Sequence, residues 1–208
     1  MKIDNININT FNQWAIKGKD KGMEIGHAPA VNEMFHIISS KSSLFTSSFD
    51  VVDIGCGNGW VIRKFLNNNN CNYALGIDGA PEMINIACKN DSLGEYINLD
   101  IDDWKSKKKF DIIFSMETFY YLKDLNKIIF NCYNSLNKNG IIIIGIDHYQ
   151  ENKPSLSWDK DFNLSLNTLS IGDWIDSFKN NGFKNIQSSI HGTKENWNGT
   201  LILFAIKN

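Results

Sequence analysis

A glycine-rich turn between an apolar run and a helical stretch is the segment of this sequence with the clearest chemical potential. Gly55, Gly57 and Gly59 alternate with other residues directly after the run 49–54, which contains Asp53. Glycines adopt backbone angles that other residues avoid and let a ligand lie against the bare main chain. Where such a turn opens a helix, its N–H groups can hold a carboxylate or a phosphate. The segment therefore predicts a binding site of the nucleotide type.

The spacing of the glycines separates two kinds of nucleotide site. A dinucleotide site is written G-x-G-x-x-G, and its third glycine lets the helix approach the strand closely. Trp60 occupies that position here, whereas Gly59 completes a G-x-G-x-G pattern that Asp53 precedes. This pattern resembles the first motif of class I S-adenosylmethionine (SAM) dependent methyltransferases. Trp60 argues against the competing hypothesis, a nicotinamide dehydrogenase.

The resemblance extends to the ends of the next three predicted strands. In this family an acid after the second strand binds the ribose hydroxyls, and Asp78 has that place; a carboxylate accepts two charge-assisted hydrogen bonds from a diol. An acid after the third strand lies near the adenine amino group, which matches Asp100, and Ile101 could lie against the ring. The segment 110–117 resembles the fourth strand and its exit loop. Over residues 49–147, the resemblance implies SAM as the methyl donor.

Most residues that the resemblance assigns to the donor also have a purely structural interpretation. The donor-site candidates are Asp53, Gly55, Gly57, Gly59, Asp78, Gly79, Met83, Asp100, Ile101 and Ser115. The glycines could form only a tight turn, and the aspartates could only cap strands. Met83 is as readily a core residue as a cofactor contact. No metal ligand is predicted.

The acceptor pocket is expected outside the carboxyl ends of the fourth and fifth strands, where ligands of open α/β sheets bind. The two exit loops contain Tyr120, Tyr121, His148 and Tyr149. Tyr121 and His148 are the candidate catalytic residues, since histidine can accept a proton near neutral pH. Tyr120 and Tyr149 are candidate acceptor contacts, and their ring faces could favour a cation. Alternatively, one tyrosine is a core residue and His148 an ordinary surface residue.

An N-terminal segment precedes the predicted core. In the family that the sequence resembles, such segments often close over the bound donor and acceptor. Trp14 and His27 are therefore candidate acceptor contacts, although packing of Trp14 against the domain is the simpler explanation. The pattern over 28–39 predicts a helix, and Pro29 suits its first turn.

Alternating apolar runs and helical segments predict the architecture that positions these residues. Strands are expected at 49–54, 72–77, 95–99, 110–115, 140–147, 183–190 and 200–206, and further helices at 60–66, 80–89, 125–137 and 171–180. The predicted fold class is α/β: a Rossmann-like, seven-stranded, mostly parallel sheet with a C-terminal antiparallel hairpin and helices on both faces. We expect one domain over 1–208, with a lid segment (1–40), a SAM-binding core (49–147) and an acceptor-side cap with the last strands (148–208).

Composition limits the function further. The 208 residues carry a formal net charge of −2, which argues against nucleic acid as a partner. Four cysteines form no C-x-x-C pair and no apolar run approaches ~20 residues, so a cytoplasmic, membrane-free protein is expected. We predict a SAM-dependent methyltransferase with a small-molecule acceptor. The acceptor atom and oligomeric state stay open, and the alternatives are an RNA or protein methyltransferase or a non-catalytic SAM-binding protein.

Overall fold

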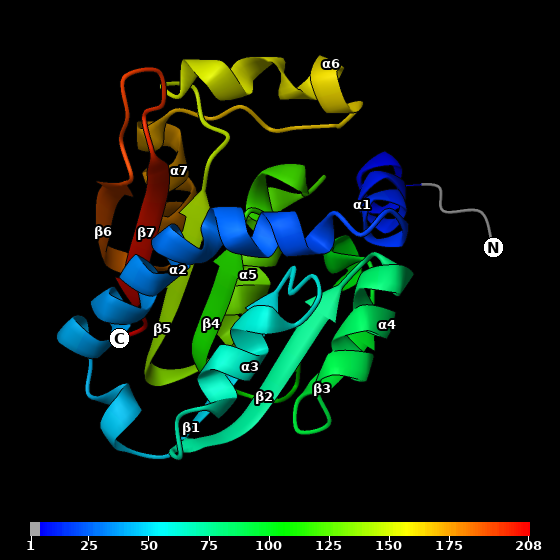
Figure 1. The fold of residues 1–208 in the computed structure, drawn as a ribbon. Coiled ribbons are helices and arrows are strands. Elements are labelled where there is room, and N and C mark those ends of the chain that lie inside the picture. Colours follow the sequence, from blue (N-terminus) through cyan, green and yellow to red (C-terminus); the bar gives the residue numbers. More distant parts are fainter. Residues whose placement is uncertain (1–4) are drawn as a thin grey trace.

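Figure 1 shows a layered molecule in which one central sheet is covered by helices. It is a computed structural model that describes residues 5–208, so the first four residues of the predicted lid segment lie outside the described part. The strands are β1 (Phe49–Ile54), β2 (Cys71–Asp78), β3 (Glu95–Asn98), β4 (Phe110–Met116), β5 (Leu136–Ile146), β6 (Lys184–His191) and β7 (Thr200–Ile206). Their order in the sheet is β3-β2-β1-β4-β5-β7-β6.

The pairing of the strands confirms the predicted fold class. β1 to β5 pair in parallel, and β7 pairs antiparallel with both β5 and β6. The strand order reverses between β1 and β4, which are neighbours although β2 and β3 separate them in the chain. At such a reversal, the loops after the two strands diverge and leave a crevice in which ligands bind.

Helices cover both faces of this sheet. They are α1 (Ile6–Ile16), α2 (Asp20–Lys41), α3 (Trp60–Leu66), α4 (Pro81–Asn90), α5 (Leu125–Ser135), α6 (Trp158–Phe162) and α7 (Ile171–Asn180). Side chains of a strand point alternately to its two faces. In β1, Val51 packs in the layer that contains α2 and α3, whereas Val52 packs in the layer that contains α5 and α7. In the described part of the chain, no helix is long and apolar enough to cross a membrane.

The N-terminal helices differ from the prediction. The expectation that Pro29 starts a helix was wrong, because α2 begins at Asp20 and Pro29 lies inside it. Proline lacks the N–H of one helical hydrogen bond. The helix nevertheless continues through it, since Val31 and Met34 on its inner side are fully buried against the sheet. α1 lies in the segment 1–40 that was expected to be a helical lid, although its bounds were not predicted, and it precedes α2 (Figure 1).

Candidate functional site

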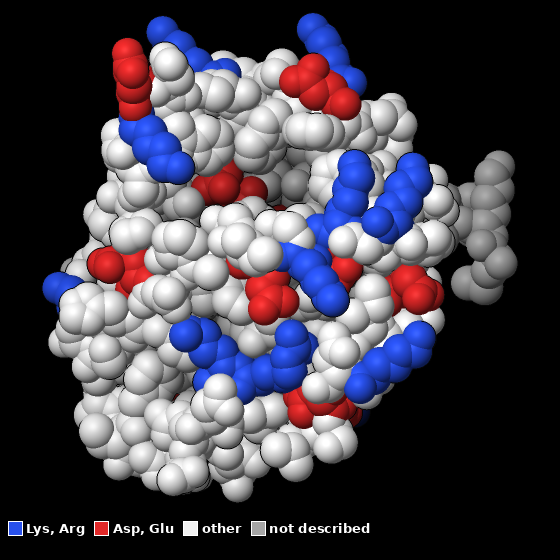
Figure 2. All heavy atoms as spheres, viewed as in Figure 1, with Lys and Arg blue, Asp and Glu red and all other residues white. Residues whose placement is uncertain are grey.

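A cavity of about 310 Å³ opens at the carboxyl ends of β1, β2 and β4. Residues of α1, α2 and the segment 158–164 also line it, and Figure 2 shows the surface hollowed between α2 and the cap. The donor-site candidates that line it are Asp53, Gly55, Gly57, Asp78, Gly79, Met83, Asp100 and Ile101. The structure thus brings residues from three strand ends to one space.

Two donor-site candidates do not line this cavity. Ser115 is buried in β4, and its hydroxyl donates a 2.6 Å hydrogen bond to the Ile54 carbonyl of β1. Gly59 lies at the N-terminus of α3, where an added Cβ would come within 2.7 Å of the Tyr96 ring. The Ser115 hydrogen bond therefore ties β4 to β1, and the missing side chain at Gly59 leaves room for Tyr96 beside the glycine turn.

The glycine turn presents bare backbone to the cavity. Gly55, Gly57 and Gly59 have φ angles of 81°, 53° and 78°, a region that side chains disfavour. A Cβ added at Gly57 would meet nothing within 4 Å, whereas one added at Gly55 would overlap the side chain of Thr118. Gly57 therefore offers open space for a ligand, and Gly55 permits close packing against the exit loop of β4.

Asp78 joins the glycine turn to the start of α4. Its carboxylate accepts hydrogen bonds from the backbone N–H of Gly57 at 2.9 Å and of Ala80 at 2.8 Å. Burial raises the pKa of Asp78, and these two hydrogen bonds oppose that rise. Each carboxylate oxygen can accept a further hydrogen bond, so Asp78 can hold the turn and a ligand hydroxyl together.

Asp53 is the least compensated charged group of the site. It is 2% exposed and lines the cavity, and among residues 5–208 no group donates a hydrogen bond to its carboxylate. Burial, and then the negative charge of Asp78, raise the pKa of Asp53 well above its usual value. A buried carboxylate without a partner is costly. The position therefore suits the cationic group of a ligand.

The far end of the cavity is closed by the start of α1. Asp100 accepts hydrogen bonds from the Asp102 N–H and from Asn5 Nδ2, both at 3.2 Å. Ile101 is 8% exposed and Met83 2%, so their side chains form an apolar wall beside this carboxylate. An acid next to two apolar surfaces can accept a hydrogen bond from the edge of a flat ring and pack against its faces.

The Asn7 side chain, which the sequence analysis did not single out, holds α1 over the cavity through hydrogen bonds. Its side-chain amide donates to the carbonyls of Tyr121 at 3.1 Å and Ser165 at 2.8 Å, and it accepts from the Ser165 N–H at 2.8 Å. The next residue, Ile8, packs directly against Gly79. The predicted lid residues Trp14 and His27 both line the cavity. Residues of α1 and α2 therefore form part of the cavity wall.

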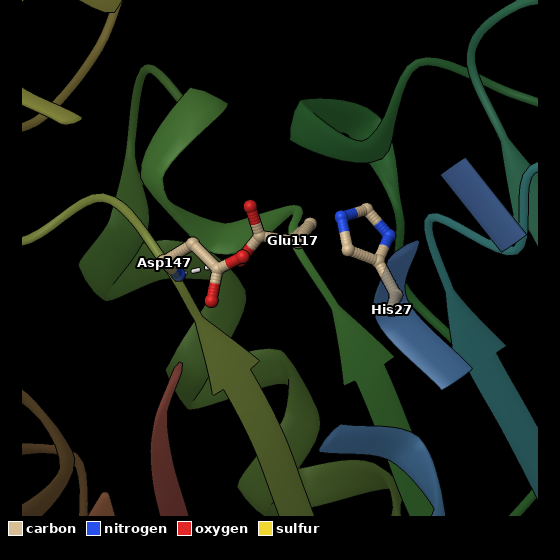
Figure 3. A group of neighbouring side chains, drawn as sticks. All are labelled: His27, Glu117 and Asp147. Carbon is tan, nitrogen blue, oxygen red and sulfur yellow. Dashed lines mark hydrogen bonds between the residues drawn. The ribbon is translucent and has the colours of Figure 1, made fainter. Parts of the chain in front are cut away.

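The end of the cavity beside the exit loop of β4 contains Glu117, which the sequence analysis did not single out. Glu117 has a φ of 58°, and its carboxylate accepts from the Tyr120 hydroxyl. It also accepts from the Asp147 N–H, as Figure 3 shows. The Tyr121 hydroxyl donates to that of Tyr120 at 3.1 Å. Tyr121 and Glu117 line the cavity, whereas Tyr120 is fully buried and supports them from below. The position of Glu117 directly after β4 was the available signal.

His148 and Tyr149 do not line the cavity, contrary to the expected acceptor contacts. The His148 ring lies between the Ser155 carbonyl, 3.0 Å from Nδ1, and the Thr168 hydroxyl, 2.7 Å from Nε2. The Tyr149 hydroxyl donates to the Gly199 carbonyl at 3.1 Å. Both side chains are buried because the segment after β5 folds back over them. They hold the cap to the sheet.

These contacts predict that the His148 side chain stabilises the folded protein. We expect His148→Ala to lower the free energy of unfolding by about 2 kcal/mol, because it removes two buried hydrogen bonds. His148→Gln, which can both donate and accept, should recover part of this loss. Urea unfolding of both variants measures it, together with their affinity for S-adenosylhomocysteine, which we expect to stay near the wild-type value. Wild-type stability in the alanine variant would contradict the assignment.

Comparisons with known proteins agree with this geometry. Residues 52–144 match the family model described as a methyltransferase domain. Malonyl-[acyl-carrier protein] O-methyltransferase 2 of Ilyobacter polytropus is 31% identical over 163 residues, which cover 72% of this chain and 60% of that protein. The corresponding enzyme of Bacillus anthracis is 29% identical over 61% of this chain and 49% of its own length. The matched part of the chain therefore spans about half to 60% of the length of these relatives.

Solved structures resemble the chain over its whole length. A chain from the complex of the Haloferax volcanii Trm112 methyltransferase activator gives a TM-score of 0.79 at 22% identity, covering 95% of this chain and 97% of that chain. A Thermotoga maritima structure described as a SAM-dependent methyltransferase gives 0.70 at 15% identity, with coverages of 96% and 99%. At such identities the likeness concerns the fold.

Proposed function

Because this chain belongs to the class I SAM-dependent methyltransferases, we propose that it transfers a methyl group from SAM to a small-molecule acceptor under the α1–α2 lid. The observation that carries the proposal is the Asp53 carboxylate, which is buried at the cavity wall and has no hydrogen-bond donor in residues 5–208. The methionine part of SAM bears an ammonium group, which supplies the charge that Asp53 lacks.

The residues around the cavity suit the other parts of the donor. The open backbone at Gly57 leaves room for a ligand against the main chain. By the resemblance of the strand ends, Asp78 would bind the ribose hydroxyls, and Asp100 the adenine amino group beside Ile101 and Met83. Bound SAM supplies an electrophilic methyl group on a sulfonium. The protein contributes positioning and, through α1, the exclusion of water.

Calorimetric titration with S-adenosylhomocysteine, SAM and NAD tests the donor. We expect the first two to bind and NAD not to bind. Asp78→Ala should weaken S-adenosylhomocysteine binding by about 1.5 to 3 kcal/mol, which is typical of a lost charged hydrogen bond. Asp176→Ala, an exposed position in α7, is the control and should keep wild-type affinity. Absence of S-adenosylhomocysteine binding to the folded wild type, or equal binding of NAD, would refute the proposal.

A carboxylate acceptor is a second candidate, because the Ilyobacter polytropus relative is named for methylating malonyl-[acyl-carrier protein]. The carboxylate of such an acceptor needs a cationic partner when it is buried. Among residues 5–208, no lysine or arginine lines the cavity. The geometry therefore supports a neutral or cationic acceptor better than an anionic one. Nothing in the cavity favours RNA or protein methylation.

A further inference from the structure

We infer that the acceptor is a small amine and that Glu117 and Asp147 bind its ammonium group beside His27. This inference deepens the proposed function and rests on it. The three side chains come from the ends of β4 and β5 and from α2, and they lie together (Figure 3). Glu117 and His27 line the cavity, and Asp147 lies beside them.

The charge of the cavity wall is the first support. The acidic residues that line it are Asp20, Glu24, Asp53, Asp78, Asp100, Asp102 and Glu117, and in the described chain His27 is the single basic side chain of the wall. Figure 2 shows acidic atoms in the hollow between α2 and the cap, and lysine and arginine side chains on the outer surface. A wall of one sign with low-dielectric surroundings concentrates ions of the opposite sign.

The Glu117–Asp147 pair is the second support. Glu117 holds a left-handed backbone conformation, which is strained for a side chain of this size, and its carboxylate is fixed by Tyr120 and the Asp147 N–H. Asp147 accepts from the Thr200 hydroxyl at 2.6 Å through one oxygen, and its other oxygen has no partner within residues 5–208. A partly buried carboxylate (Glu117) and a buried one (Asp147) are thus held side by side, and among residues 5–208 no lysine or arginine lines the adjoining cavity.

The titration behaviour of the pair agrees with this geometry. Burial, and then the charge of Asp147, raise the pKa of Glu117 well above its usual value. Burial raises the pKa of Asp147 to about 6, although the Thr200 hydrogen bond opposes the rise. Both shifts are those expected for carboxylates that lack a counter-ion. An ammonium group in the site would reverse them.

His27 completes the site as a neutral hydrogen-bond acceptor. Burial lowers the pKa of His27 to about 4, so its ring is uncharged near neutral pH and cannot neutralise the carboxylates. One ring nitrogen and one oxygen from each acid lie within 4.8 Å of one another. Two acceptors of one tetrahedral ammonium lie about 4.7 Å apart if each N–H···A distance is about 2.9 Å. The upper limit of 4.8 Å on these separations is therefore compatible with one bound nitrogen.

Aromatic rings form the adjacent wall. Phe11 packs edge to face with Trp14 at 5.2 Å between ring centroids and with Tyr121 at 5.0 Å, and Trp14 packs with Phe162 at 5.6 Å. All four rings line the cavity. Aromatic faces attract a cation and bury its apolar substituents. The carbon part of the amine is therefore aromatic or bulky and apolar.

The proposed reaction balances with these groups. The ammonium R–NH₃⁺ gives one proton to the free oxygen of Asp147, which leaves a lone pair on nitrogen. That lone pair forms a bond to the methyl carbon while the bond from sulfur to that carbon breaks, and its electron pair stays on sulfur. The products are R–NH₂⁺–CH₃ and S-adenosylhomocysteine. The proton on Asp147 then passes to solvent when the lid opens.

A divalent cation is the competing occupant of the same three side chains. Both Glu117 oxygens already accept hydrogen bonds, and one Asp147 oxygen accepts from Thr200. A metal would therefore have to displace or share several of these contacts. An ammonium needs only the free Asp147 oxygen, the remaining lone pairs of Glu117 and the His27 ring. The existing hydrogen bonds favour the amine.

The test compares three probes of similar shape and different charge. Phenethylamine, 2-phenylethanol and 3-phenylpropionate are titrated near neutral pH into protein loaded with S-adenosylhomocysteine, in the presence of EDTA. We expect the amine to bind about tenfold more tightly than the alcohol or more, and the carboxylate to bind most weakly. Glu117→Gln and Asp147→Asn should each reduce this preference for amine over alcohol about tenfold. Glu195→Gln, in the exposed loop between β6 and β7, is the matched control.

The outcomes distinguish a failure of the proposed function from a failure of the amine inference alone. If the wild type fails to bind S-adenosylhomocysteine, the proposed function fails and the inference falls with it. If S-adenosylhomocysteine binds but the carboxylate or the alcohol binds as well as the amine, or no probe binds, the amine inference is overturned alone. An unchanged preference in both folded variants, or amine binding that requires added Zn²⁺ or Mg²⁺, would overturn it too.

Discussion

Gly55→Ala is expected to lower the free energy of unfolding by about 3 kcal/mol or to prevent folding, whereas Gly57→Ala should cost about 1 kcal/mol. The two residues share a left-handed backbone conformation, with φ angles of 81° and 53°. They differ in their surroundings, because a Cβ at Gly55 would lie within 2.7 Å of Thr118 Cβ and Cγ2, and one at Gly57 would meet nothing within 4 Å. Urea unfolding of both variants measures the difference.

A double variant isolates the contact with Thr118. Thr118→Gly removes the three heavy atoms that would lie nearest to the new Cβ at position 55. Gly55→Ala combined with Thr118→Gly should therefore be more stable than the sum of the two single effects predicts, by more than about 1 kcal/mol. The backbone strain at position 55 would remain. Additive effects, or equal losses for Gly55→Ala and Gly57→Ala, would show that conformation alone limits this turn.

The fold could be predicted because its determinants are local in the sequence. Central parallel strands are buried on both faces, so β1, β4 and β5 are dense runs of valine, isoleucine and phenylalanine. The glycine turn was recognisable because it directly follows such a run, and Asp78 because it ends the next strand along the chain. Boundaries were less certain: β5 begins at Leu136, earlier than the expected Gly140, because Leu136 pairs in register with Phe110.

The site residues that sequence reasoning missed depend on contacts between distant segments. Asn7 is one asparagine among many, and only the folded chain brings it to the carbonyl of Ser165. His148 was expected in the acceptor pocket because it follows β5, but the cap folds over it and occupies both ring nitrogens. Glu117 follows β4 as expected for a site residue, yet the role proposed for it depends on Asp147, which follows β5. The sequence pattern predicts where a residue lies along a helix or strand. It does not predict which distant residues that side chain contacts in the folded chain.

Asp53→Asn is expected to stabilise the unliganded protein and to weaken S-adenosylhomocysteine binding by roughly 10- to 100-fold. The affinity loss follows from a lost charged hydrogen bond of about 1.5 to 3 kcal/mol. The gain in stability follows from burial, because Asp53 is 2% exposed and the variant need not bury its charge. A variant that is more stable than the wild type but binds S-adenosylhomocysteine more weakly would identify Asp53 as a binding residue. Loss of a carboxylate with a structural role would lower stability instead. Denaturant unfolding and calorimetry measure the two effects.

The pH dependence of the same variant gives an independent check. The folded pKa of Asp53 is raised above the unfolded value of 3.8, so its effect on wild-type stability is most favourable below that value and is lost as pH rises through the folded pKa. The stability difference between Asp53→Asn and wild type should therefore grow with pH.

Because an ammonium ligand needs the ionised carboxylate, S-adenosylhomocysteine affinity should rise with pH in the wild type and less in the variant. Asp78, Glu117 and Asp147 also have raised pKa values, which is why the comparison uses the difference between the two proteins. A difference independent of pH would mean that Asp53 is already neutralised in the free protein, and the ammonium site would have to be sought elsewhere in the cavity.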